Sequence, residues 1–207
     1  MSAILILFST VDGHTLTICE RIRRIAEQAG HDVTLAPIED TAGIDLPSFD
    51  RIVIGASIRY GKHRPAVFKF IEANLQLLES RPNAFFTVNI VARKPEKNRP
   101  ETNPYLRKFL RQTPWKPQRL DVFAGRLDYP RYGPLDRLMI RFIMLITKGP
   151  TAPDTVIEFT DWQRVDDFAR AIAGTEERNA PDAAPPPSPH LPCGHLKKAE
   201  ERKMEIE

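Results

Sequence analysis

The first fifteen residues constrain the fold of this chain more than any other segment. An apolar, β-branched run over 4–8 stops abruptly at Ser9, a short polar turn follows, and a helical pattern starts near Thr15. A strand that leads through a polar loop into a helix can bind a phosphate, because backbone N–H groups point into the loop and the helix dipole favours an anion. The segment therefore predicts an α/β fold with an anion site at its first turn.

The composition of this loop narrows the kind of anion. It matches neither GxGxxG nor GxxxxGK[ST], which disfavours a dinucleotide site of the Rossmann type and a nucleoside triphosphate site. The spacing of Thr10, Gly13 and Thr15 is similar to the phosphate loop of flavodoxins, which holds the phosphate of FMN, and the hydroxyl of Ser9 is a further donor. An ordinary strand-to-helix turn is the alternative.

Composition limits the class of protein. A length of 207 residues suits one decorated domain, and 42% hydrophobic residues suffice for a core. A net charge of +3 is too low for a dedicated nucleic-acid binder, so we expect no nucleic-acid partner. Cys19 and Cys193 are far apart and suggest neither a disulfide framework nor a zinc site. We expect a strand rather than a signal peptide at 1–8, and no apolar run is long enough to span a membrane.

Strand and helix patterns alternate along the chain. After the first strand, further strands are predicted over 32–36, 51–55, 84–92 and 120–125, and helices over 15–29, 65–78 and 105–112. A last helix is predicted to carry Val165, Phe168, Ala169 and Ile172. Thr160 and Gln163 form a predicted capping box. This alternation, with near-continuous apolar strands, predicts a flavodoxin-like, doubly wound, five-stranded parallel sheet in the order 2-1-3-4-5, within a domain that covers 1–174.

An insertion at about 126–154 interrupts the last βα unit. Residues 134–148 form an amphipathic pattern with flanking arginines. As a helix this segment would be about 21 Å long, too short to span the hydrocarbon core of a bilayer. Its wide apolar face suits an interfacial helix on anionic lipid or a cover over a lipophilic substrate. Packing on the domain's own core is the alternative.

The tail over 175–207 is rich in proline and charge, and we expect it to be disordered. His190, Cys193 and His195 lie there without a fourth ligand or a scaffold, so we expect no metal site.

Three loops are expected to meet at the carboxyl edge of the sheet, where ligands bind in this fold. They follow the first, third and fourth strands and cover 9–15, 56–62 and 89–95. Tyr60 offers a face that can stack on a flat ring, and Ser57 or Asn89 can reach the polar edge of such a ring. Positive charge flanks the loops at Arg59, Lys62, Arg93, Lys94 and Lys97.

Several longer motifs make the resemblance specific. The strings FSTVDGHT, GASIRYGKH, ARKPEKNRPETN, YPRYGPLDRLMIRFIM and FTDWQRV occur in order between Ile4 and Ala173. They closely resemble the family of quinone-dependent, flavodoxin-like protoporphyrinogen oxidases of bacterial haem biosynthesis. GASIRYGKH and ARKPEKNRPETN are the most diagnostic, since ordinary flavodoxins do not share them.

The resemblance implies an FMN enzyme that oxidises protoporphyrinogen IX and passes electrons to a membrane quinone, menaquinone or ubiquinone. It also implies a peripheral position on the cytoplasmic side of the inner membrane, with the insertion helix on the anionic surface. By position, the FMN-binding residues are Thr10, Val11, Asp12, Gly13, His14 and Thr15, then Ser57, Ile58, Arg59, Tyr60 and Gly61, and finally Asn89, Ile90, Val91, Ala92 and Arg93. His14 and Asp12 depart from the residues common in flavodoxins. No residue is assigned as a catalytic acid or base, because the flavin carries the redox chemistry.

Three other functions remain open from the sequence. A flavodoxin-like NAD(P)H:quinone reductase would use the same loops. An electron-transfer flavodoxin is disfavoured by the mildly basic charge, because such carriers are typically acidic. A flavin-free scaffold is also possible, since a fold does not prove a function.

Overall fold

Five parallel strands form the central sheet in the order β2-β1-β3-β4-β5, which confirms the predicted doubly wound topology. The computed structural model describes residues 1–146 and 149–174, so the predictions for the tail, including His190, Cys193 and His195, lie outside the described residues. The strands are β1 (Ala3–Ser9), β2 (Asp32–Pro37), β3 (Arg51–Ser57), β4 (Asn83–Val88) and β5 (Arg119–Phe123).

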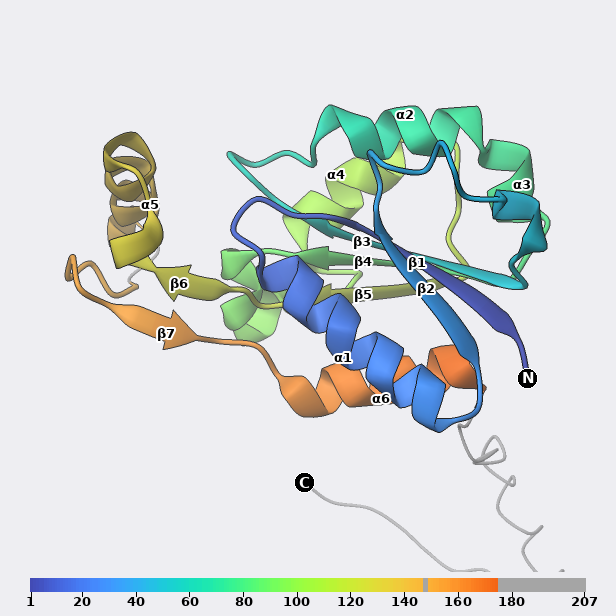
Figure 1. Cartoon of the computed structure of the whole chain (residues 1–207). Coiled ribbons are helices and arrows are strands. Elements are labelled where there is room, and N and C mark those ends of the chain that lie inside the picture. Colours follow the sequence, from blue (N-terminus) through green and yellow to red (C-terminus); the bar gives the residue numbers. More distant parts are fainter. Residues whose placement is uncertain (147–148, 175–207) are drawn as a thin grey trace, which may run out of the picture. The chain divides into compact units, whose positions relative to one another are not determined.

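Helices cover both faces of this sheet (Figure 1). One face carries α1 (His14–Gln28) and α6 (Trp162–Ala173), and the other carries α2 (Pro65–Ala73), α3 (Leu75–Glu79) and α4 (Pro104–Gln112). Short 3-10 turns η1 (Leu46–Ser48), η2 (Ile90–Arg93) and η3 (Pro95–Lys97) connect the elements. The two-faced cover explains why the strand sequences are apolar without alternation.

Close packing fixes the middle of the sheet. Ile4, Leu5, Ile6 and Leu7 of β1 are fully buried, on alternate faces. In β3, a Cβ on Gly55 would lie 2.2 Å from the ring of Phe86 on the neighbouring β4. Any larger residue would displace that buried ring, so the glycine allows β3 and β4 to pair in register.

Two predicted elements are wrong in their extent. The helix predicted over 65–78 breaks at Asn74, whose side-chain Nδ2 donates to the carbonyl of Phe70 at 2.8 Å and competes with the helical ladder. The strand predicted over 84–92 ends at Val88, because the Asn89 side chain accepts from the amide of Ala92 and starts η2. In both places the asparagine side chain adds a bond beside the backbone one: the amide of Asn74 still donates to Phe70 at 3.1 Å, and that of Ala92 to the carbonyl of Asn89 at 3.2 Å.

The insertion contains more regular structure than predicted. It begins with β6 (Arg126–Asp128) and the turn η4 (Tyr129–Arg131), continues with α5 (Pro134–Ile146), and returns through β7 (Val156–Glu158). Strands β6 and β7 pair antiparallel, a two-stranded sheet that the sequence did not predict. The predicted helix over 134–148 is confirmed as α5, with its last two residues outside the described part of the chain.

The predicted capping box before α6 is also wrong. Asp161 is the N-cap, and its carboxylate accepts from the amide of Arg164 at 3.2 Å. Thr160 instead donates its hydroxyl proton to the carbonyl of Ala124 at 2.9 Å, and the side-chain Nε2 of Gln163 donates to the carboxylate of Asp167. The threonine therefore belongs to the site at the sheet edge rather than to the helix.

Candidate functional site

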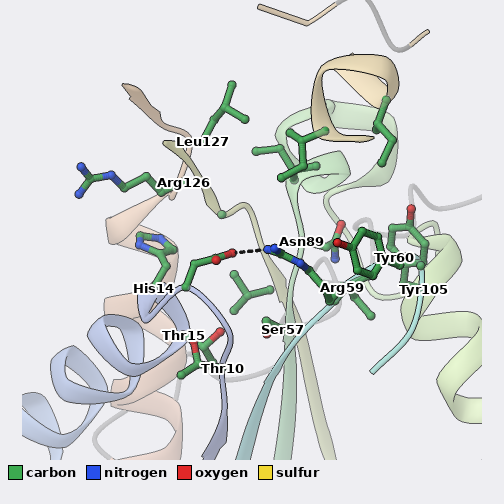
Figure 2. A pocket seen from close by; sticks show the side chains of 18 of the residues that line it. Thr10, His14, Thr15, Ser57, Arg59, Tyr60, Asn89, Tyr105, Arg126 and Leu127 are labelled. Atoms are coloured by element: carbon green, nitrogen blue, oxygen red, sulfur yellow. Dashed lines mark hydrogen bonds and ion pairs between the residues drawn. The ribbon is translucent and has the colours of Figure 1, made fainter. Parts of the chain in front are cut away.

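A pocket lies at the carboxyl edge of the sheet, where the three predicted loops meet (Figure 2). It leaves about 870 Å³ of empty space between its walls, part of it open to solvent. The predicted residues that line it are Thr10, Asp12, His14, Thr15, Ser57, Ile58, Arg59, Tyr60, Gly61, Asn89 and Ile90.

Other predicted residues do not line this pocket. Val11 is exposed, and Val91 and Ala92 are buried in the domain. Arg93 donates to the carbonyl of Ile90 at 3.2 Å and, because burial disfavours its charge, has a lowered pKa. Gly13 acts through its backbone: its φ of 84° forms the turn before α1. Of the cations expected at the rim, Arg59 lines the pocket, whereas Lys62, Lys94 and Lys97 do not.

One end of the pocket is lined by the hydroxyl groups of Thr10, which follows β1, Thr15 of α1 and Ser57 of β3. Figure 2 shows Thr10, Thr15 and Ser57 together at this end. The hydroxyls of Ser9 and Thr15 are buried and have no hydrogen-bond partner among the described residues. Thr10 accepts from the amide of Gly13 at 3.1 Å, which leaves its own proton to donate. Because no described side chain caps α1, its first-turn amides also point toward a ligand.

His14 closes this end on the side of α6. Its Nε2 lies 2.6 Å from the hydroxyl of Thr160. Since Thr160 donates its proton to the carbonyl of Ala124, the imidazole Nε2–H is the donor in that bond. Burial lowers the pKa of His14, opposed by nearby Glu158, and the ring is therefore neutral at pH 7. The histidine orients the loop without adding charge to the anion end.

Asn89 presents a buried amide at the end of β4. Its Oδ1 accepts from the amide of Ala92 at 3.1 Å and from Nδ2 of Asn103 at 3.3 Å. Its own Nδ2 has no partner among the described residues, although the side chain is buried. A buried, unpaired donor carries a desolvation penalty that a ligand acceptor removes. Asn103, which fixes this orientation, was not identified from the sequence.

Arg59 links segments on both sides of the pocket. Its guanidinium donates to Asp12 in the first loop at 2.8 Å and to Asp136 of α5. It also lies over the rings of Tyr60 and Tyr132, at 5.4 and 5.9 Å from their centroids. Burial raises the pKa of Tyr132. Two carboxylates thus share one guanidinium in a partly buried setting.

The other end of the pocket is apolar and belongs to the insertion. Leu127 of β6, Tyr132 after η4, and Ile140 and Ile143 of α5 line it, and Figure 2 shows Leu127 opposite the hydroxyl end. Pocket residues that the sequence did not identify are Val88, Tyr105, Gly125, Arg126, Leu127, Tyr132, Ile140 and Ile143. The apolar stripe of the insertion was the available signal, but the sequence did not show which side of it faces the pocket.

The two ends together suit FMN better than a larger nucleotide. The phosphate fits the hydroxyl end, where Thr15 lines the pocket with a hydroxyl that has no partner and Thr10 has a proton left to donate. The polar edge of the ring fits beside Asn89, whose free amide donates toward the pocket. A second nucleotide-binding loop is absent from the pocket as the described residues define it.

Comparison with known proteins agrees with this geometry. A flavodoxin domain model matches residues 5–154. The protein named protoporphyrinogen IX dehydrogenase [quinone] of Escherichia coli K12 is 44% identical over 169 residues, which cover 82% of this chain and 93% of that protein. The protein of the same name from Leishmania major is 42% identical over 183 residues, 88% of this chain and 77% of that protein.

Among solved structures, the two-electron reduced flavodoxin of Megasphaera elsdenii superposes with a TM-score of 0.50 at 16% identity, over 83% of this chain and 98% of that one. This likeness shows the fold alone. The domain match and the curated relatives go further: the chain belongs to the flavodoxin-like family of quinone-dependent protoporphyrinogen IX dehydrogenases.

Proposed function

We propose that this protein oxidises protoporphyrinogen IX to protoporphyrin IX with FMN as its cofactor and a membrane quinone, menaquinone or ubiquinone, as the electron acceptor. Its relatives carry the name protoporphyrinogen IX dehydrogenase [quinone]. Bound FMN supplies the redox chemistry. The residues of the chain hold the cofactor, exclude water and place the substrate beside it.

The observation that carries this proposal is the apolar end of the pocket. An enzyme that acts on a large apolar substrate needs an apolar wall beside its cofactor, whereas an electron carrier binds no such substrate. Here Leu127, Ile140 and Ile143 add such a wall to the cofactor cleft. A large, flat, apolar substrate matches it, because burying apolar surface contributes about 25 cal/mol per Å².

Cations at the pocket suit the propionates of the substrate. Arg126 has a side chain that is 40% exposed, and it forms an ion pair with Asp128 at 3.0 Å. Arg59 is less exposed and already shared between two carboxylates. We therefore assign the propionate contact to Arg126, whose guanidinium can form a bidentate pair with a carboxylate.

The outer face of α5 supports a peripheral attachment to the membrane. Its exposed apolar residues recur at helical spacing and form one stripe: Leu135, Leu138, Met139, Phe142, Leu145 and Ile146. Arg131 and Arg141 are exposed nearby and can meet anionic headgroups. No helix in the described part of the chain is long and apolar enough to cross a bilayer. This stripe supports an interfacial helix, which on the cytoplasmic side of the inner membrane would place the pocket near lipophilic quinone.

An anaerobic assay tests the proposal. The purified chain is first examined for a flavin spectrum and then mixed with protoporphyrinogen IX, and porphyrin fluorescence is followed with and without added quinone. We expect fluorescence to rise with quinone and to stay near background without it. A parallel reaction with NAD(P)H and quinone tests the reductase alternative. Quinone reduction by NAD(P)H, with no oxidation of the porphyrinogen, would overturn the proposal.

A further inference from the structure

Asp136 connects the insertion to the loop that follows β3 in the flavodoxin-like body of the domain. It lies in the first turn of α5. Its carboxylate accepts from the guanidinium of Arg59 and from the hydroxyl of Tyr60, both in the loop after β3. The same guanidinium binds Asp12 in the first loop at 2.8 Å. One carboxylate of the insertion thus meets two side chains that line the pocket.

We propose that Asp136 is a positioning residue. It docks α5 on the loop after β3 and thereby holds Ile140 and Ile143 at the pocket. The docking itself follows from the contacts of Asp136. Its consequence for substrate rests on the proposed function.

The spacing along α5 supports this role. Asp136, Ile140 and Ile143 are separated by four and three residues and share one face of the helix. Ile140 and Ile143 line the pocket, whereas the opposite stripe is exposed. The carboxylate therefore fixes the same face that presents the isoleucines to the pocket.

Arg137 and Met144 tie α5 to the insertion itself, although the small core that Met144 joins also includes Ile90 of η2. Arg137 donates to the carbonyls of Tyr129 and Tyr132, which belong to η4 and the residue after it. Within α5, all of which the structure describes, Met144 alone is buried, and it packs with Leu127, Tyr129 and Tyr132. With so little burial, the polar contact to the body has a large share in holding the helix over the pocket.

The conformation of Tyr60 depends on its hydrogen bond to Asp136. Its backbone has a φ of 50°, a conformation that side chains other than glycine adopt rarely. Its ring is half exposed, so the hydroxyl bond to Asp136 restrains a side chain that packing leaves free. Loss of the carboxylate would release Tyr60 and leave Arg59 with Asp12.

Amide hydrogen exchange on the FMN-loaded protein tests the docking. In Asp136→Asn, we expect the amides of α5 to exchange about tenfold faster, the effect of weakening one charge-assisted contact. The FMN content should stay unchanged. Tyr60→Phe should act in the same direction with a smaller effect, and Asp136→Glu should restore most of the protection. Asp154→Asn is the matched control, since it removes the same charge from an exposed position in the insertion.

Steady-state kinetics separate positioning from general stability. We expect Asp136→Asn to raise the KM for protoporphyrinogen IX about fivefold or more and to change kcat less. Unchanged exchange of the α5 amides in Asp136→Asn, or loss of FMN from that variant, would overturn the inference. If the wild-type protein does not oxidise protoporphyrinogen but the exchange of α5 responds as expected, the proposed function fails and the docking role of Asp136 stands.

Discussion

The two ends of the pocket are built by regions that are held together in different ways. The hydroxyl end belongs to the sheet, whose two faces are covered by extensive cores that contain β1, β3 and β4. The apolar end belongs to the insertion, whose small core centres on Leu127, Tyr129, Tyr132 and Met144. We infer that the sheet sets cofactor retention and stability, and that the insertion sets access to the substrate.

Buried polar atoms show the same division. Ser9, Thr15 and Asn89 carry polar atoms that are buried inside the sheet half without a hydrogen-bond partner among the described residues. The insertion half instead leaves its apolar side chains on the surface of α5. A ligand with hydrogen-bond acceptors would pair the polar atoms of the sheet half. An apolar phase would cover the exposed side chains of the insertion half.

The largest effect should come from removing hydroxyls at the sheet end. In Thr10→Val with Thr15→Val, each lost hydrogen bond to the phosphate costs about 1.5–3 kcal/mol, so FMN affinity should fall by about two to four orders of magnitude. Titration of the apoprotein with FMN, followed by flavin fluorescence, measures this loss.

Thr17→Val is the control for that double variant, because Thr17 is exposed on the same helix and does not line the pocket. Its FMN affinity should match the wild type. Stoichiometric FMN in the purified double variant would show that the first loop does not hold the phosphate, and the division between the two ends would then be wrong.

The second-largest effect should be a loss of membrane binding and turnover when the insertion is changed, with FMN still bound. Phe142 and Ile146 are 58% and 65% exposed, so Phe142→Asp with Ile146→Asp should preserve the fold. If these side chains enter the membrane interface, losing them costs about 1.5–3 kcal/mol each, and affinity for anionic vesicles should fall about a hundredfold or more. Vesicle sedimentation and quinone-coupled turnover measure the two losses.

Gln28→Asp with Gln76→Asp adds the same charge at exposed positions of the sheet half and is the matched control. It should bind vesicles within about threefold of the wild type, because only long-range electrostatics changes. Wild-type vesicle binding by the α5 variant would contradict membrane attachment through this helix, whereas unfolding of that variant would show that α5 belongs to the core.

How much of this could be predicted from sequence differs between the same two regions. The strand order and the hydroxyl loop were predictable, because the apolar strand patterns and the Thr10–Gly13–Thr15 spacing are local signals. The break at Asn74 was not, because a side-chain bond to Phe70 decides between two conformations that the apolar pattern fits equally.

The insertion shows where local reasoning ends. Its helix was predicted from an apolar stripe, but Ile140 and Ile143 face the pocket while Phe142 faces outward. That assignment depends on Asp136 meeting Arg59, a contact across 77 residues of sequence. A pairing of this range leaves no periodic signal, so the pocket wall was recognised only in three dimensions.

The third effect concerns acid stability, which should belong to the sheet half. His63 packs edge-on against the aromatic rings of Phe85 and Phe109. This burial lowers its pKa to about 3. Below the ordinary histidine pKa of 6.5, the unfolded chain binds a proton that the folded chain does not. The free energy of unfolding should therefore fall as the pH drops, by about 2 kcal/mol between pH 7 and 5 from this group.

Urea unfolding at several pH values measures that slope. His63→Gln keeps a partner for the hydroxyl of Thr87, which lies 3.0 Å from His63 Nε2, but cannot take up the proton. Its stability should vary less with pH by about that amount, whatever its stability at pH 7. An equal slope in His63→Gln and wild type would mean that acid sensitivity arises elsewhere in the molecule.

The smallest effect lies where the chain returns from the insertion to the sheet half. Because Asp161 caps α6, Asp161→Ala should lower the free energy of unfolding by about 1 kcal/mol. Gln163→Ala should change it by less than about 0.5 kcal/mol, because the glutamine contacts Asp167 rather than the helix start. Thermal unfolding of both variants measures the difference. Equal losses would support the capping box that the sequence predicts. They would then count against the contact between Thr160 and His14. A larger loss from Asp161→Ala, with unchanged FMN affinity, would show that α6 can weaken at its start without disturbing the hydroxyl end of the pocket.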